Sequence, residues 1–145
     1  MKKQHGFNLV ELMVVVAIVA IIAAIAYPSY QEQIRKSRRA ECAGAVTSLG
    51  NTMEQFFTVN STYLGAADAG GNTGAPAIFT TTCPVDGGTT TYNLTISAAT
   101  ASTYTVQAAP TGTQTKDKCG TLTLTNTGLK GVTSAASGIT WQDCW

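Results

Sequence analysis

The chain has 145 residues and a net charge of +1; 44% of its residues are hydrophobic and only 12% are charged. This length suits one domain with a core. From residue 40 onward there are three lysines, no arginine and six acidic residues, a balance of −3 that gives no broad attraction for nucleic acid. One histidine and no C-x-x-C pair exclude an ordinary zinc site. Without a Ser-His or Cys-His set or a Gly-rich phosphate loop, we expect no enzyme and no cofactor.

A long apolar segment dominates the N-terminal region. Residues 12–27 carry no charge and no strongly polar side chain. Counted back to Phe7, the stretch as a helix would span about 30 Å, the thickness of a bilayer core. A secretory signal peptide cut after Ala26 would look similar. Glu11 interrupts the stretch, where an acid costs about 3 kcal/mol at the bilayer centre but is tolerated near its end. Position alone leaves the role of Glu11 open.

The helical pattern continues past the apolar segment, so we expect one helix from about residue 8 to residue 58. Its first half is apolar all round and needs a membrane or a bundle of similar helices. Its second half is amphipathic and needs a sheet over one face. The residues expected on that face are Cys42, Val46, Leu49, Met53, Phe56 and Phe57.

The remainder of the chain predicts a loop followed by a sheet. Residues 60–90 are rich in Gly, Asn, Asp, Pro and Ala, which indicates a long loop. Apolar and polar residues then alternate in 92–97, 104–109 and 121–125, and a short fourth strand is expected at 129–132. Four strands with one apolar face suit an antiparallel sheet packed on the amphipathic helix, an α+β fold.

Four widely spaced cysteines follow the apolar segment: Cys42, Cys83, Cys119 and Cys144. Beside a membrane segment they indicate two disulfides in an oxidising compartment. The alternative is reduced, buried cysteines in a cytosolic protein. Four cysteines allow three pairings.

Residues 6–18 (GFNLVELMVVVAI) and 23–30 (AAIAYPSY) resemble the N-terminus of type IV prepilins and pseudopilins. The resemblance implies that a prepilin peptidase cuts after Gly6 and methylates the new amine of Phe7. It also implies that Glu11 pairs with the N-terminal amine of a neighbouring subunit in the filament core. Each of these charges is costly alone in apolar surroundings, and pairing them removes much of that cost.

Two positions of this segment depart from the family pattern. Asn8 stands where the family usually has Thr, and Ala20 stands where many major pilins have Gly. Because Gly costs about 1 kcal/mol more than Ala in a helix interior, Ala20 should hold the helix better. Pro28 lacks a backbone donor and is expected to kink the helix.

The resemblance divides the chain into a leader (1–6), a transmembrane or filament-core helix (7–28) and a globular pilin domain (29–145). It places the precursor in the bacterial inner membrane with its C-terminal domain in the periplasm, and the mature chain in an extracellular pilus. A literal positive-inside count opposes this orientation, because four basic residues follow the span and two precede it. The resemblance and the cysteines both favour a periplasmic C-terminal domain, and we expect that orientation.

The C-terminal region resembles the disulfide-bounded tail of type IVa pilins, and we favour the pairs Cys119–Cys144 and Cys42–Cys83. The first would hold the tail against the strand at residue 121, and the second would tie the long loop to the helix. Residues 118–124 (KCGTLTL) and 128–131 (GLKG), with a closing Cys-Trp, also resemble PilE-like minor pilins. Some relatives of that subgroup are DNA receptors for natural transformation.

The expected function is that of a type IV pilus subunit, a minor pilin that primes the filament or joins it. Its partners would be other pilins, the prepilin peptidase and the inner-membrane assembly machinery. The alternatives are a major pilin, a DNA-binding minor pilin and a type II secretion pseudopilin. DNA contacts would fall on Lys116, Lys118 and Lys130, but Asp117 stands among them without an arginine, so DNA is the less favoured partner.

Overall fold

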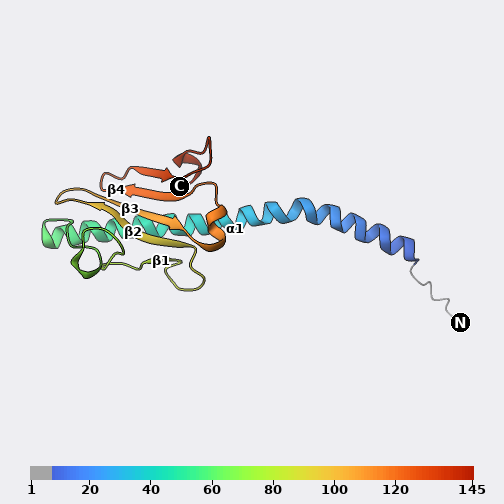
Figure 1. Ribbon diagram of the computed structural model, residues 1–145, viewed down its shortest axis with the longest axis horizontal. Helices are drawn as coiled ribbons and strands as arrows, with labels where there is room; N and C mark the ends of the chain where they lie inside the picture. Colours follow the sequence, from blue (N-terminus) through green and yellow to red (C-terminus); the bar gives the residue numbers. More distant parts are fainter. Residues whose placement is uncertain (1–7) are drawn as a thin grey trace. The chain divides into compact units, whose positions relative to one another are not determined.

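Figure 1 shows a computed structural model of the chain, which describes residues 8–145. These residues form two compact units, one that ends at Ile34 and one that comprises Arg35–Trp145. Helix α1 (Leu9–Asn60) runs through both. The predicted leader and Phe7 lie outside the described residues.

The N-terminal part of α1 is long and apolar enough to cross a membrane, and none of its most apolar window is buried within the described structure. Its large side chains are all more than half exposed, for example Ile21 at 64%. The helix continues through Ala20 and Pro28 without interruption. The kink expected at Pro28 stays a prediction.

The second unit contains one antiparallel sheet whose strands lie side by side in chain order. Its strands are β1 (Thr82–Cys83), β2 (Tyr92–Ala99), β3 (Tyr104–Pro110), β4 (Thr121–Thr125) and β5 (Lys130–Thr133). The two outer strands, β1 and β5, are the shortest, with two and four residues. The register of β2 against β3 shifts between Ile96 and Ala98, as at a β-bulge.

The α+β architecture predicted from the sequence is confirmed, but the predicted number of strands is wrong. The sheet has five strands rather than four. The additional strand, β1, lies inside the segment predicted as loop and pairs with β2 through two residue pairs. A strand of two residues is too short to show alternation, so its sequence carries no strand signal. Three short 3-10 helices were also not predicted: η1 (Asp68–Gly70), η2 (Gly112–Lys116) and η3 (Trp141–Asp143).

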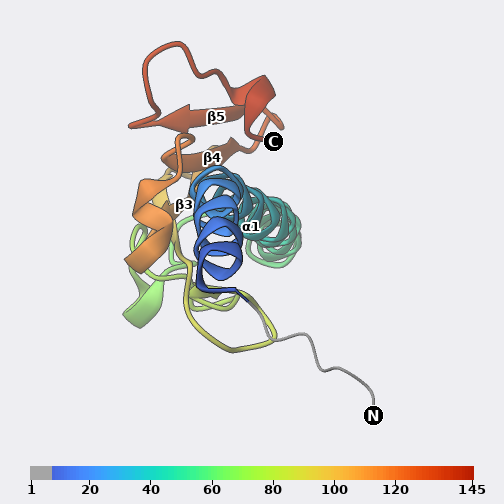
Figure 2. The ribbon, with the colours of Figure 1, turned by 90° about the vertical axis from the view of Figure 1, so that its right-hand side faces the viewer.

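The core of the second unit lies between α1 and one face of the sheet (Figure 2). On α1 the residues at helical spacing are buried as predicted: Cys42, Val46, Leu49 and Met53 are fully buried, and Phe56 and Phe57 are partly buried. Helix and sheet approach closely at Gly50, where an added Cβ would lie 3.1 Å from Leu124 Cδ2. The Tyr104 hydroxyl donates to the Gly50 carbonyl there (3.1 Å). Apolar side chains of β2, β3 and β4 complete the core: Leu94, Ile96, Val106, Ala108, Leu122 and Leu124.

Candidate functional site

A buried polar network joins α1 to the segment that precedes β4. Arg39 is only 3% exposed, and its guanidinium pairs with the Asp117 carboxylate, whose side chain is fully buried. The Tyr92 hydroxyl donates to the second carboxylate oxygen of Asp117 (2.7 Å), and the Gln114 amide donates to the same oxygen (3.3 Å). Burial raises the pKa of Tyr92, and its hydrogen bond to Asp117 adds to the rise. The carboxylate is thus paired and hydrogen-bonded, as a buried charge must be.

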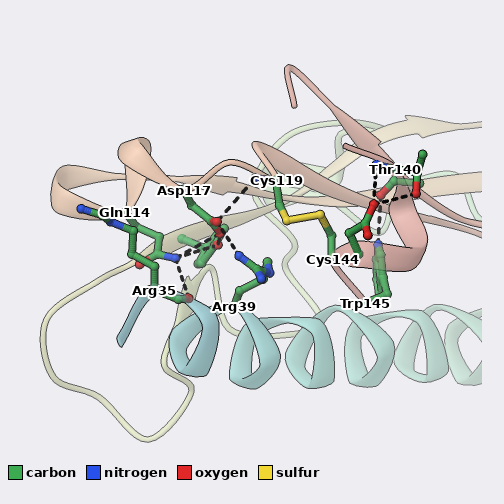
Figure 3. The surroundings of a disulfide bond; sticks show 11 residues. Arg35, Arg39, Gln114, Asp117, Cys119, Thr140, Cys144 and Trp145 are labelled. Carbon is green, nitrogen blue, oxygen red and sulfur yellow. Dashed lines mark hydrogen bonds and ion pairs between the residues drawn. A yellow bond between two sulfur atoms is a disulfide. The ribbon is translucent and has the colours of Figure 1, made fainter. Parts of the chain in front are cut away.

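Gln114 fixes η2 against the first turn of α1 in this unit (Figure 3). Its side-chain amide donates to the Arg35 carbonyl (3.0 Å) and to the Tyr92 hydroxyl (3.0 Å). Beside it, the Arg38 guanidinium donates to Thr113 Oγ1 (3.3 Å). Segments that are 75 or more residues apart in the sequence therefore meet on one surface.

This contact gathers the positive charge of the second unit. We call the surface formed by residues 35–41 and 112–118 the basic surface. These two segments contain six basic and two acidic residues, whereas the rest of Arg35–Trp145 contains one basic and four acidic residues. One of the two acids, Asp117, is buried against Arg39. Among the exposed side chains of the basic surface are Lys36, Lys116 and Lys118.

The structure brings together only two of the three lysines considered as DNA contacts. Lys116 and Lys118 flank the buried Asp117 and are exposed. Lys130 lies elsewhere, because it pairs with Leu124 near the end of β4, whereas Lys118 precedes the start of that strand. About 10 Å of strand separates the two ends. Contact of all three lysines with DNA stays a prediction, with Lys130 at the other end of β4 from Lys118.

Arg38 was not expected near these lysines, because it belongs to the basic cluster that directly follows the apolar segment and lies far from them in the sequence. The structure places the Arg38 guanidinium on Thr113, three residues from Lys116. No periodic pattern could have found this contact, since it depends on the return of η2 to α1.

Two disulfides close the second unit, between Cys42 and Cys83 and between Cys119 and Cys144. These are the pairs favoured from the sequence. Their sequence separations are 41 and 25 residues. In the chain-entropy account, loops of this size contribute about 3–4 kcal/mol each. The backbone amide of Cys119 also donates to Asp117 (3.4 Å), so the second disulfide is joined to the buried network.

The C-terminal tail is fixed beside β5. The Trp145 indole N–H donates to the Gly131 carbonyl (3.0 Å), and Lys130 Nζ lies 5.1 Å from the centroid of the Trp145 ring. Asp143 accepts hydrogen bonds from the backbone and the side chain of Thr140. These bonds lower the pKa of Asp143, and the hydrogen bond from the Thr140 backbone contributes more than the one from its side chain. The tail is an ordered part of the unit, held by aromatic and capping contacts.

A hollow of about 320 Å³ lies between α1 and the turn after β4, lined in part by Glu54, Tyr104, Asn126 and Lys130. Burial raises the pKa of Tyr104, as does its interaction with Glu54. Within residues 8–145 no cluster of three or more His, Cys, Asp or Glu side chains could hold a metal ion.

The residues expected to act in processing and assembly lie at the N-terminus. Gly6 and Phe7 fall outside the described residues. Glu11 lies in the first turn of α1, among the exposed apolar side chains. Leader cleavage, methylation and pairing of Glu11 therefore stay predictions.

Comparison with known proteins identifies two family matches. The model of the family described as "Type IV minor pilin ComP, DNA uptake sequence receptor" matches residues 28–123, more than half of the chain. The model described as "Prokaryotic N-terminal methylation motif" matches residues 1–27. No curated protein matches the chain.

Two solved structures have similar folds. A type IV pilin from Shewanella oneidensis is 18% identical, with a TM-score of 0.50, and the match covers 77% of this chain and 97% of that one. The non-core minor pilin PilV from Neisseria meningitidis is also 18% identical, with a TM-score of 0.48, covering 72% of this chain and 94% of that one. The first of these likenesses agrees with the α+β pilin fold described above.

Proposed function

The chain belongs to this family of type IV minor pilins, and we propose that it is made as a membrane-held precursor and built into a pilus as a minor subunit. In this proposal residues 1–6 are a leader, residues 7–28 form the membrane and filament-core helix, and residues 29–145 form the pilin domain. A prepilin peptidase cuts after Gly6 and methylates Phe7. The single observation that carries the proposal is the methylation motif matched at residues 1–27, which includes the start of an apolar helix with no buried residue in its most apolar window.

The exposed apolar helix also indicates which partners the chain would have. An exposed apolar helix needs lipid around it before assembly and similar helices around it afterwards. Other pilin subunits and the inner-membrane assembly machinery would supply that change of surroundings. The two disulfides support a periplasmic position for the second unit, since disulfides persist in oxidising compartments.

Glu11 would set the register of assembly. Cleavage after Gly6 creates an ammonium group one helical turn before Glu11 in the sequence. In an apolar filament core the carboxylate and the amine of a neighbouring subunit would each be costly without the other. A subunit that enters in another register leaves both charges unpaired.

Glu11→Gln tests this role with little change in side-chain shape. We expect normal cleavage and methylation but loss of the chain from sheared filaments, measured by mass spectrometry of the filament and membrane fractions. Val10→Ala is the control, because it alters the adjacent position and leaves the charge in place. Normal incorporation of the Glu11→Gln chain would contradict the pairing. An uncut chain that begins at Met1 would contradict the processing itself.

The same measurement tests the minor role. A small amount of this chain beside a dominant second pilin is expected for a minor subunit. Filaments composed mainly of this chain would make it the major pilin instead.

DNA capture is a second candidate function, favoured by the description of the matching family as a receptor for a DNA uptake sequence. Lys116 and Lys118 would contact phosphate, and Lys130 would do so from the other end of β4. The test is the mobility of a short duplex with the full chain in detergent at low and high salt. Binding that weakens steeply with salt is expected, since phosphate contacts release counterions. No shift at low salt would remove this candidate.

A further inference from the structure

We propose that the basic surface docks the unit Arg35–Trp145 onto anionic phospholipid headgroups while the chain is held in the membrane by its N-terminal helix. This inference rests on the membrane-held precursor proposed above. It assigns a partner to a charge distribution that neither the core nor the two disulfides require.

The charge of this unit is strongly divided. The two segments of the basic surface hold six of its seven basic residues, and four of its six acidic residues lie outside these segments. One of those four, Asp143, lies close enough to Lys118 for the lysine to contribute to its lowered pKa, so Lys118 adds less positive charge than Lys36 and Lys116. Arg39 and Asp117 are buried and paired with each other, so this pair removes one base and one acid from the count. Five basic residues then remain in the two segments, with Glu41 as the exposed acid. One end of the unit therefore presents a positive surface, although the unit as a whole is close to neutral.

Arg38 and Lys116 show that this surface is built from two parts of the chain. Arg38 donates to the neutral hydroxyl of Thr113, which orients the guanidinium without cancelling its charge. Lys116, the last residue of η2, is exposed three residues after Thr113. Gln114 and Asp117 anchor residues 112–118 at two points, to Arg35 and Arg39 of α1. Because the segment is already fixed, the lysine loses less conformational freedom on binding than it would on a mobile loop.

Chain connectivity favours lipid over other anionic partners. Only seven residues separate Tyr27, at the end of the apolar segment, from Arg35. As helix they span about 12 Å, so the basic surface stays near the membrane boundary whatever angle the two units adopt. Lys and Arg side chains can reach back toward the interface. At physiological ionic strength the attraction between exposed charges extends about 8–10 Å. Because the N-terminal helix holds the unit at the membrane, lipid headgroups are present near the basic surface at a high effective concentration. An anion in solution has no such advantage.

Hydrogen exchange of the full chain in lipid nanodiscs tests the docking. One preparation contains zwitterionic lipid and the other contains phosphatidylglycerol as the anionic lipid. We expect the amides of residues 112–116 and 35–40 to exchange about fivefold more slowly in the anionic discs at low salt. The amides of residues 126–129, at the β4–β5 turn, serve as an internal reference that should not change. High salt should remove the difference.

Two variants that each remove one lysine charge distinguish docking through the basic surface from a general effect of net charge. Lys116→Gln should reduce the protection, whereas Lys130→Gln removes the same charge from an exposed lysine outside the basic surface and should not. Equal protection in the two lipids, no protection in either, or equal loss in both variants would each overturn the proposal. Protection of the same amides by added duplex DNA, without a difference between lipids, would assign the surface to DNA and overturn it as well. A chain that does not stay in the discs would instead contradict the membrane-held precursor.

Discussion

The two halves of α1 solve the problem of a charge in apolar surroundings in opposite ways. In the second half Arg39 is buried, and its partner Asp117 comes from the same chain, 78 residues later. In the first half Glu11 lies among exposed apolar side chains, and its expected partner is the amine of another subunit. The buried charge of Arg35–Trp145 is thus paired within the chain. Under the proposed function, Glu11 would be paired only by another subunit. One continuous helix can serve both folding and assembly because the two tasks use different turns.

The largest expected effect concerns the buried pair. Asp117→Asn keeps the shape of the side chain but leaves the Arg39 guanidinium buried without a counter-charge. We expect the free energy of unfolding to fall by about 3–5 kcal/mol. Denaturant unfolding of the full chain in detergent measures it.

Two further variants check that reasoning. Asp86→Asn removes an exposed carboxylate and should change the stability by less than about 0.5 kcal/mol. The double variant Arg39→Leu with Asp117→Leu should recover much of the loss, because no charge is then left buried alone. A loss of similar size in the double variant would show that the hydrogen bonds around Asp117, rather than the charge pair, stabilise the contact.

A smaller effect is expected from a comparison of side-chain packing in the two halves of α1. Leu49 is fully buried, and Leu49→Ala should destabilise the second unit by about 2–5 kcal/mol. Ile21 is 64% exposed, and Ile21→Ala should leave the unfolding midpoint nearly unchanged. We expect Ile21→Ala to act on filament yield instead, measured in the sheared fraction. Equal destabilisation by the two substitutions would contradict the division of the helix.

The smallest expected effect is a decrease in stability at alkaline pH that is caused by Tyr92. Burial raises the pKa of this tyrosine, so the fold favours its neutral form. The contribution to stability is complete below the unfolded pKa near 10 and decreases as pH rises above it. The slope from one such group is at most about 1.4 kcal/mol per pH unit. Tyr92→Phe should flatten the fall in stability above pH 10, whereas Tyr30→Phe, at an exposed tyrosine, should not.

The core could be predicted from the sequence because it depends on local periodicity. Val46, Leu49 and Met53 recur at helical spacing, and all three are buried. The alternating segments that became β2, β3 and β4 follow the same reasoning with a period of two. These patterns are strong because each spans several repeats.

The polar site could not be predicted in this way. Arg39, Gln114 and Asp117 are residue types that pattern reasoning assigns to solvent, yet all three are buried. Their burial depends on partners far away in the sequence, and no period connects them. The position of Lys130 away from Lys118 likewise follows from the register of β4 and β5, which the spacing of lysines along the chain does not contain.

The short outer strands β1 and β5 affect how copies of the chain can pair when they lie close together. A strand at the border of a sheet offers unpaired backbone groups to any strand nearby, and long flat borders invite aggregation. Here one border has two residues and the other has four, and the second contains Lys130. Copies concentrated in a membrane, as in the proposed precursor, would therefore offer one another little unpaired backbone. Edge-to-edge pairing of their sheets would compete only weakly with assembly through the helices.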